Sequence, residues 1–183
     1  MRIEVPLRSA YKLINHGPTT LISTAHGERR NVMAAAWVMA LDFEPPKLAA
    51  VIASSTFTRE LVLASGEFVV QTPTLAQRAL TIAVGSESGR DRDKFAAHGI
   101  ATSAASKVRA PLIEGCAAWL ECVRIGEPAM EERYDLFVGE VVAAWVESEC
   151  WDGRGFAFAR DEQRTIHHLA GGVFFATGSK HGA

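Results

Sequence analysis

The sequence predicts a mainly β fold with two or three short helices inserted between the strands. Two long, mostly apolar runs in the second half, residues 117–125 and 136–146, are typical of strands. In the second run apolar residues fill both sets of alternating positions, so both faces of this strand are expected to be buried. Such a strand suits the wall of a barrel or a sheet covered by helices.

Three further strands are predicted within residues 19–52. Residues 19–24 are β-branched and partly apolar, and a glycine-containing turn follows them. Residues 31–41 are apolar on both faces, which fits either a buried strand or a buried helix, and their place between two short strand-like runs favours a strand. Pro45 and Pro46 bar a continuing helix, and residues 48–52 predict the third strand.

Helices are predicted at three places. The hydroxyl-rich turn at 54–58 runs into a short helix that ends at Gly66, since glycine is the residue that most often follows a helix end. Apolar residues recur at helical spacing over 74–84, where Thr74 is placed to cap the first turn. Residues 91–98 predict a further short helix with an acidic start.

The remaining segments complete this organisation. Residues 67–72 predict another strand, which Pro73 ends. The segments 85–90 and 126–134 are polar or charged and predict loops. No repeat, low-complexity segment or linker interrupts the chain, so residues 1–183 are expected to form a single domain.

Composition excludes several classes of protein. The 183 residues include 19 Lys plus Arg against 21 Asp plus Glu, a net charge of −2 at pH 7 that offers no electrostatic footprint for nucleic acid. The apolar runs fall short of the ~20 residues that a membrane helix needs, and the charged N-terminal segment is unlike a signal peptide, so we expect a cytoplasmic protein without a membrane span. Cys116, Cys122 and Cys150 lack paired spacing, which favours reduced, buried thiols.

One local pattern suits a phosphate group. Hydroxyl groups at Ser54, Ser55, Thr56 and Thr58 precede a helix whose first N–H groups are unpaired, and Arg59 adds a full positive charge. An ordinary helix cap with a solvated arginine explains the same residues.

Other charged and titratable residues have ordinary explanations. Lys94 is a second cation, for which a solvated helix start is the ordinary explanation. His167 and His168 are adjacent and point apart on a regular element, so no metal site is predicted.

Six short segments, read together, favour the phosphate site over an ordinary helix cap with solvated cations. In order along the chain they are PTTLIST at 18–24, NVMAAAW at 31–37, TREL at 58–61 before GEFVV at 66–70, SGRDRDKF at 88–95, APLIE at 110–114 and LFVGEV at 136–141. Over residues 11–175 the chain resembles the flavin reductase-like, FMN-binding split-barrel family, which includes flavoredoxin.

The resemblance implies a homodimeric split β-barrel that holds FMN near the subunit interface. The isoalloxazine ring would lie against one strand, where backbone N–H groups bond its pyrimidine edge and N5, and Phe174 would sit beside the ring. The residues implied on that strand are Asn31, Met33, Ala34, Ala35, Ala36 and Trp37. The residues implied on the phosphate side are Ser54, Ser55, Thr58, Arg59 and Lys94.

The implied function is that of an FMN-dependent oxidoreductase, in which NAD(P)H passes a hydride to the flavin and the electrons go on to an acceptor or a redox partner protein. Two departures bear on this function. Ala34 to Ala36 stand where the family often has Thr-Ala-Ser, so only backbone donors remain there. Tyr134 and Asp135 stand where the family often has a histidine linked to nicotinamide or flavin contact. A flavoredoxin-like electron carrier, or a non-catalytic FMN-binding protein without NAD(P)H activity, is therefore the alternative, and a barrel without flavin is a third.

Overall fold

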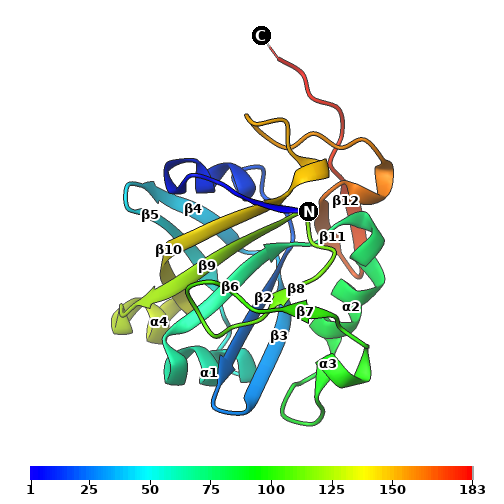
Figure 1. Ribbon diagram of the computed structural model, residues 1–183. Coiled ribbons are helices and arrows are strands. Elements are labelled where there is room, and N and C mark those ends of the chain that lie inside the picture. The colour runs from blue at the N-terminus through cyan, green and yellow to red at the C-terminus, as the bar shows by residue number, and fades with distance from the viewer. Residues whose placement is uncertain (183) are drawn as a thin grey trace.

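The computed structural model describes residues 1–182, and its main element is an eight-stranded antiparallel sheet. The strands lie in the order β3-β2-β6-β9-β10-β5-β4, and β1 pairs with the far end of β10 (Figure 1). Their bounds are β1 Arg2–Glu4, β2 Thr20–His26, β3 Arg29–Ala35, β4 Val38–Phe43, β5 Pro46–Val51, β6 Glu67–Thr72, β9 Ala118–Ile125 and β10 Leu136–Glu147. Two small pairs accompany the sheet, β7 Thr102–Ser103 with β8 Leu112–Ile113 and β11 Ile166–Ala170 with β12 Val173–Ala176.

Both faces of the large sheet are buried over its central strands. Neighbouring residues on one strand enter different cores, as on β2, where Ile22 packs in the first core and Leu21 in the second. On β10, Phe137 and Val141 join the first core, whereas the half-buried Trp145 packs against the second. The two-sided burial predicted for this strand is thus confirmed.

Short helices lie beside the sheet and cover part of its second face (Figure 1). They are α1 Phe57–Ser65, α2 Arg78–Ser86, α3 Lys94–Ala97 and α4 Pro128–Tyr134, with 3₁₀ helices at Leu7–Leu13, Leu75–Gln77, Ser148–Cys150 and Asp161–Gln163. Val84 of α2 and Phe95 of α3 are buried in the second core together with Val32 of β3. This packing brings the loop between α2 and α3 next to β3.

The predicted helix boundaries have clear physical causes. Thr56 caps α1 by accepting from the Arg59 N–H, and Gly66 follows the helix with a positive φ of 71°. Thr74 forms a capping box with Gln77 ahead of α2, which confirms the predicted cap.

The predicted continuous strand over 31–41 is wrong in two respects. The chain forms two strands there, because β3 ends at Ala35 and β4 begins at Val38. The expectation of burial on both faces also fails, since the Trp37 residue is 74% exposed and Met39 is 59% exposed. The reason is topological: β4 is the last strand of the sheet order, and among the described residues it pairs with β5 alone.

The predicted loop over 126–134 is largely helix α4. Pro128 opens this helix, where its missing N–H is tolerated, and Asp135 ends it with a left-handed φ of 55°. Glu131 on the inner side accepts two hydrogen bonds from Arg124 of β9, at 2.7 and 2.6 Å. The helix was hidden in the sequence because its buried anchor is a charged residue whose partner lies on another strand.

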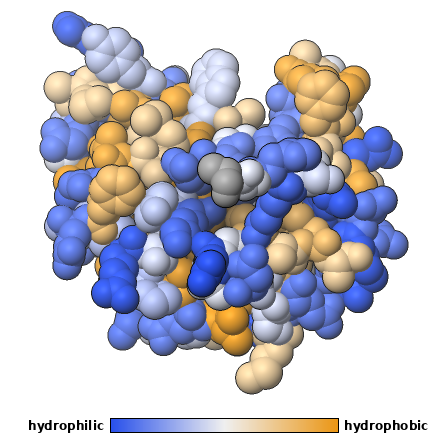
Figure 2. All heavy atoms as spheres, turned by 90° about the horizontal axis from the view of Figure 1, so that it is seen from above, coloured by the Kyte–Doolittle hydropathy of each residue, from blue (hydrophilic) through white to orange (hydrophobic). Residues whose placement is uncertain are grey.

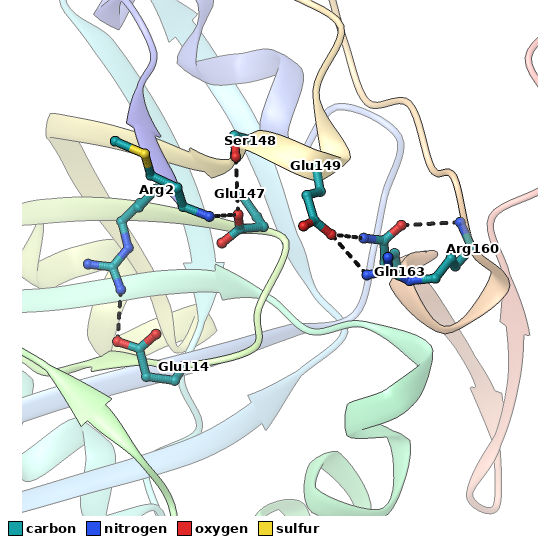
Figure 3. Close-up of polar contacts among 8 residues, drawn as sticks. Arg2, Glu114, Glu147, Ser148, Glu149, Arg160 and Gln163 are labelled. Carbon is teal, nitrogen blue, oxygen red and sulfur yellow. Dashed lines mark hydrogen bonds and ion pairs between the residues drawn. The ribbon is translucent and has the colours of Figure 1, made fainter.

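Ion pairs fasten the N-terminus to the sheet (Figure 3). The Met1 amino group pairs with the Glu147 carboxylate at the end of β10, and Arg2 Nη2 donates to Glu114 Oε1 at 3.0 Å. The first contact holds β1 against β10 at the end opposite to the pairing of β5 with β10, and the second ties β1 to the residue that follows β8.

The surface itself is mixed. On the face seen in Figure 2, hydrophobic residues form separate groups among hydrophilic ones. The three cysteines are free and buried, as predicted. Within residues 1–182, no helix has both the length and the apolar character needed to cross a membrane.

Candidate functional site

Two adjoining cavities lie between β3, α1, α2 and the β11–β12 hairpin, and they share Ala34 and Gly85. The first, which we call the lysine cavity, measures about 170 Å³ and is lined by Asn31, Met33, Ala34, Ser55, Thr56, Phe57, Thr58, Val84, Gly85, Glu87, Ser88, Gly89 and Lys94. The second, the alanine cavity, measures about 250 Å³ and is lined by Thr19, Ala34, Ala35, Ala36, Thr81, Ile82, Gly85, Ser86, His168, Gly172 and Phe174.

Lys94 is a buried cation in the wall of the lysine cavity. The residue is only 3% exposed, and its Nζ donates to Val32 O at 2.9 Å and to Val84 O at 2.7 Å. An ammonium has three N–H groups, so one remains to donate. Burial lowers the pKa of Lys94, an effect that the charge of Glu87 partly offsets. Because Lys94 forms no ion pair within residues 1–182, an anion in this cavity would compensate its charge.

Asn31 offers an unused acceptor in the same cavity. Its Nδ2 donates to Thr58 Oγ1 at 2.8 Å, whereas its Oδ1 is buried without a hydrogen-bond partner in the described chain. An unpaired buried acceptor costs about 1–3 kcal/mol, so a ligand hydroxyl group that donates to Oδ1 would be stabilised. Thr58 accepts from Asn31, which leaves its own O–H free to donate.

Position 89 requires glycine, because its backbone lies close to the Asn31 side chain. A Cβ at position 89 would lie 2.1 Å from Asn31 Oδ1 and 2.9 Å from Phe57 Cδ1. Both contacts are far below van der Waals separation, so any side chain here would displace the cavity wall.

The first turn of α1 adds neutral donors to the lysine cavity. The Thr56 hydroxyl is used within the chain, since it accepts from the Arg59 N–H at 3.3 Å and donates to a backbone carbonyl. The N–H groups of Phe57 and Thr58 belong to the first turn, which lacks intrahelical acceptors and carries partial positive charge. The hydroxyl groups of Ser55 and Ser88 also line the cavity.

The alanine cavity has a flat apolar wall with a few polar atoms at its edge. Helix α2 lies close to β3 at Gly85. A Cβ on Gly85 would lie 3.2 Å from the Ala34 Cβ. The backbone N–H groups of Ala36 and Trp37, between β3 and β4, donate to no acceptor within residues 1–182. On the opposite side the Phe174 ring packs against His168 at 5.2 Å between ring centroids.

The two cavities bring most of the predicted site residues together, while their roles in flavin binding stay predictions. Those in the lysine cavity are Asn31, Met33, Ala34, Ser55, Thr58 and Lys94. Those in the alanine cavity are Ala34, Ala35, Ala36 and Phe174. Ser54, Arg59 and Trp37 line neither cavity.

Arg59 is bound to the start of β10 and to α4. Its Nη1 pairs with the Asp135 carboxylate, and its Nη2 donates to Glu131 O at 2.8 Å. The guanidinium also lies 5.2 Å from the centre of the Phe137 ring. Three of its five N–H groups are used in the described chain, the third by Ile52 O, so Nε and one Nη2 N–H remain, and direct contact of Arg59 with a phosphate stays a prediction.

Sequence reasoning missed several lining residues. Gly89 appeared only within a motif, and nothing in the sequence shows that Asn31 lies against it. His168 was set aside because its neighbour is also a histidine, although the turn that follows β11 brings it beside Phe174. Glu87, a carboxylate at this cavity, is paired with His98 at 3.2 Å. Thr81 and Ser86 are polar residues on the mostly apolar helix α2, and they were the sequence signal that could have placed this helix at the cavity.

The fold is a split β-barrel, mainly β with a few short helices, and solved structures share it. An FMN-binding domain of a flavin reductase-like enzyme from Shewanella baltica OS155 is 42% identical, with a TM-score of 0.97 over 100% of this chain and 97% of that chain. Flavoredoxin of Desulfovibrio vulgaris (Miyazaki F) is 24% identical, with a TM-score of 0.80 over 91% of this chain and 90% of that chain, a likeness of fold alone.

Residues 14–167 match the model of the flavin reductase-like domain family. The chain therefore belongs to this family, and the resemblance inferred from the sequence is confirmed. A relative of almost equal length, the uncharacterized protein YddH of Escherichia coli strain K12, is 41% identical over 181 residues, which cover 97% of this chain and 96% of YddH.

Proposed function

We propose that this protein binds FMN in the two adjoining cavities and acts as an FMN-dependent NAD(P)H oxidoreductase, with residues 1–183 forming one cytoplasmic domain. The observation that carries the proposal is the buried Lys94 ammonium, which has one unused N–H and no carboxylate partner among the described residues. A ligand with a phosphate group would supply the missing negative charge. Family membership and the FMN-binding relative from Shewanella baltica support the choice of ligand.

The donors and acceptors of both cavities fit the three parts of FMN. Lys94, Thr58 and the first turn of α1 would hold the phosphate, as charge-assisted bonds and helix N-termini do elsewhere. Asn31 Oδ1, which lacks a donor, would accept from a hydroxyl group of the ribityl chain. The alanine cavity, with its apolar wall and the free N–H groups of Ala36 and Trp37, would hold the ring.

Bound FMN would supply the redox chemistry, since its ring accepts a hydride from NAD(P)H and later gives up the electrons. The chain positions and shields the reacting ring. Ala34, Ala35 and Phe174 exclude water from the ring face, and the backbone N–H groups at Ala36 and Trp37 orient the pyrimidine edge. His168 lies in the same cavity and makes no side-chain hydrogen bond within residues 1–182, so it is available to a ligand.

Spectroscopy and rapid mixing test this proposal. The purified protein should be yellow or should take up FMN in a fluorescence-quench titration. A colourless protein that binds no FMN would reject both flavin functions. Stopped-flow mixing with NADH and with NADPH should bleach the bound flavin, and turnover should follow when an acceptor is added.

A flavin that neither coenzyme reduces would point to the second candidate, an electron carrier supplied by a redox partner protein. Positions 134 and 135 favour this candidate, because they hold Tyr134 and Asp135 and no histidine. The Asp135 carboxylate is already paired with Arg59.

The proposal includes a homodimer in which a second copy covers strand β4. This edge strand and the residue before it expose large apolar side chains: Trp37, Met39, Leu41 and Phe43, each 51–74% exposed. Monomeric proteins rarely expose contiguous apolar patches of this kind. Ala36 lines the alanine cavity and directly precedes Trp37, so a partner on β4 would lie beside the proposed ring site.

A further inference from the structure

A further cavity lies between the 3₁₀ helix Leu7–Leu13, the segment 156–158 and the C-terminal segment that follows β12. We call it the aromatic cavity; it measures about 520 Å³ and shares no lining residue with the lysine cavity or the alanine cavity. Three of its lining residues are cations, Lys12, Arg164 and Lys180, and within residues 1–182 none is a carboxylate. A chain whose net charge is −2 thus places three positive side chains around one opening.

Lys12 is the cation of this cavity that lacks a counter-charge. Its Nζ donates to the carbonyl oxygen of Arg154 at 3.1 Å, and no carboxylate pairs with it within the described chain. The residue is half-buried. Because an ammonium has three N–H groups, two remain for a ligand, and a bound anion would compensate the charge.

The other two cations are paired with carboxylates that do not line the cavity. Arg164 Nε donates to Asp161 Oδ1 at 2.8 Å, and its Nη1 donates to the carbonyl oxygens of residues 177 and 178. Lys180 Nζ pairs with Asp152 Oδ2 at 2.6 Å. Both side chains keep unused N–H groups in the described chain, on Arg164 Nη2 and on Lys180 Nζ. The cavity therefore combines one uncompensated positive charge with further donors.

Aromatic rings form the apolar wall of this cavity. Phe156 and Phe158 both line it, and their rings stack with centroids 5.4 Å apart and an interplanar angle of 19°. Trp151 and His16 pack against Phe156 in edge-to-face contacts, at 5.9 and 5.2 Å between ring centroids. Both phenylalanine residues are only half-buried, so they keep surface for a ligand. Such a wall suits a flat ring, because stacked and edge-to-face aromatic pairs are more favourable than burial of the same area alone.

From this arrangement we propose that the aromatic cavity binds a small aromatic carboxylate. Phe156 and Phe158 would pack on its ring, and its carboxylate would accept from Lys12 and Arg164. An inorganic anion would leave the aromatic wall without a partner, whereas a neutral aromatic molecule would leave the lysine without a counter-charge. The aromatic cavity is separate from the proposed flavin site, so this inference goes beyond the proposed function and does not depend on it.

Isothermal titration calorimetry with matched probes tests the inference, in the absence and in the presence of excess FMN. We expect benzoate to bind with a Kd below about 1 mM under both conditions. Benzamide lacks the charge and inorganic phosphate lacks the ring, and each should bind at least about tenfold more weakly. Cyclohexanecarboxylate keeps the charge but not the aromatic ring, and it should bind at least about threefold more weakly.

Variants locate the binding site. Lys12→Met keeps the length of the side chain and should weaken benzoate binding at least about tenfold, and Phe158→Leu should weaken it at least about threefold. Lys107→Met removes an exposed lysine outside the cavity and should keep the wild-type affinity. Cooperative urea unfolding of each variant checks that it is folded.

Four results would overturn the inference. The first is wild-type protein that shows no saturable binding of benzoate up to about 5 mM. The second is a pair of affinities for benzoate and benzamide within about twofold of each other, which would mean that the cations take no part. The third is unchanged benzoate affinity in folded Lys12→Met. The fourth is displacement of benzoate by excess FMN, which would place the aromatic acid in the flavin site.

Discussion

The Lys94 ammonium donates to the carbonyl oxygen of Val84 at 2.7 Å. Val84 lies in the last turn of α2, where carbonyl groups lack intrahelical donors and carry partial negative charge. The same ammonium lines the lysine cavity. One side chain therefore stabilises the end of a helix and presents a positive charge to a ligand, so its removal should affect both folding and binding.

Replacing Lys94 by methionine should separate phosphate recognition from ring recognition. We expect Lys94→Met to lower FMN affinity by about tenfold or more, since a charge-assisted hydrogen bond contributes about 1.5–3 kcal/mol. Riboflavin, which lacks the phosphate, should lose less than about threefold. Parallel titrations with the two flavins measure the difference, and the exposed Lys107→Met is the control. An equal loss for both flavins would contradict the proposed phosphate site.

Adding one methyl group at Gly89 should close the lysine cavity. Because the new Cβ of Gly89→Ala would lie 2.1 Å from Asn31 Oδ1, we expect flavin affinity to fall and the free energy of unfolding to drop by about 1–3 kcal/mol. Gly178→Ala is the control, since a Cβ there meets nothing within 4 Å. Flavin titration and urea unfolding check both effects. Unchanged flavin affinity in Gly89→Ala would place the ligand elsewhere.

Arg59 should affect flavin binding indirectly, by holding the start of α1 against α4 and Asp135. Its donors contact Asp135 and the Glu131 carbonyl, so we expect Arg59→Ala to lower FMN and riboflavin affinity by similar factors and to reduce stability. Asp135→Asn should have a weaker effect in the same direction, because it removes the charge and keeps a hydrogen-bond acceptor. A selective loss of FMN binding in Arg59→Ala would show instead that this guanidinium contacts the phosphate.

The pair of Glu131 with Arg124 should make the fold sensitive to acid. Hydrogen bonds from Arg124 hold the pKa of Glu131 below its ordinary value of 4.5. The pair therefore contributes stability above about pH 4.5 that is lost as the pH falls through the lowered pKa. We expect Glu131→Gln to reduce the free energy of unfolding by about 2 kcal/mol at pH 7, because it leaves Arg124 without its counter-charge.

Urea unfolding between pH 7 and pH 3 measures this effect, using wild-type protein and the variant. The difference between them should shrink as the medium becomes more acidic. A difference that is constant across the pH range would contradict the role of the ion pair.

Charges on the edge strand should prevent dimer formation. We expect Met39→Glu/Leu41→Glu to run as a monomer in size-exclusion chromatography with light scattering, because burying these carboxylates against a second copy is unfavourable. Leu169→Glu, on the exposed part of β11, is the control. A wild-type protein that is already monomeric would reject the proposed homodimer.

Several elements of the fold could be predicted from local signals. Thr56, Gly66 and Thr74 mark helix ends by side-chain capping or by a left-handed φ, which depend on residues close in sequence. Helix α4 could not be predicted in this way. Its buried face is held by Glu131, and the arginine that neutralises this carboxylate lies on the neighbouring strand β9.

The candidate site shows the same difference between features that local sequence signals predict and features that depend on tertiary contacts. The sequence alone determined the family, the mainly β class and three of the segments that line the lysine cavity, residues 31–37, 54–59 and 88–95, because these follow from short motifs and from hydrophobic periodicity. Only the tertiary structure decided what each cation does. Arg59 and Lys94 look equivalent in the sequence, yet Arg59 pairs with Asp135, 76 positions away. Within residues 1–182 the Lys94 ammonium donates only to the carbonyl oxygens of Val32 and Val84. The physical reason is that a buried charge takes its partners from whatever the packed strands and helices bring near it, and sequence spacing does not record that proximity.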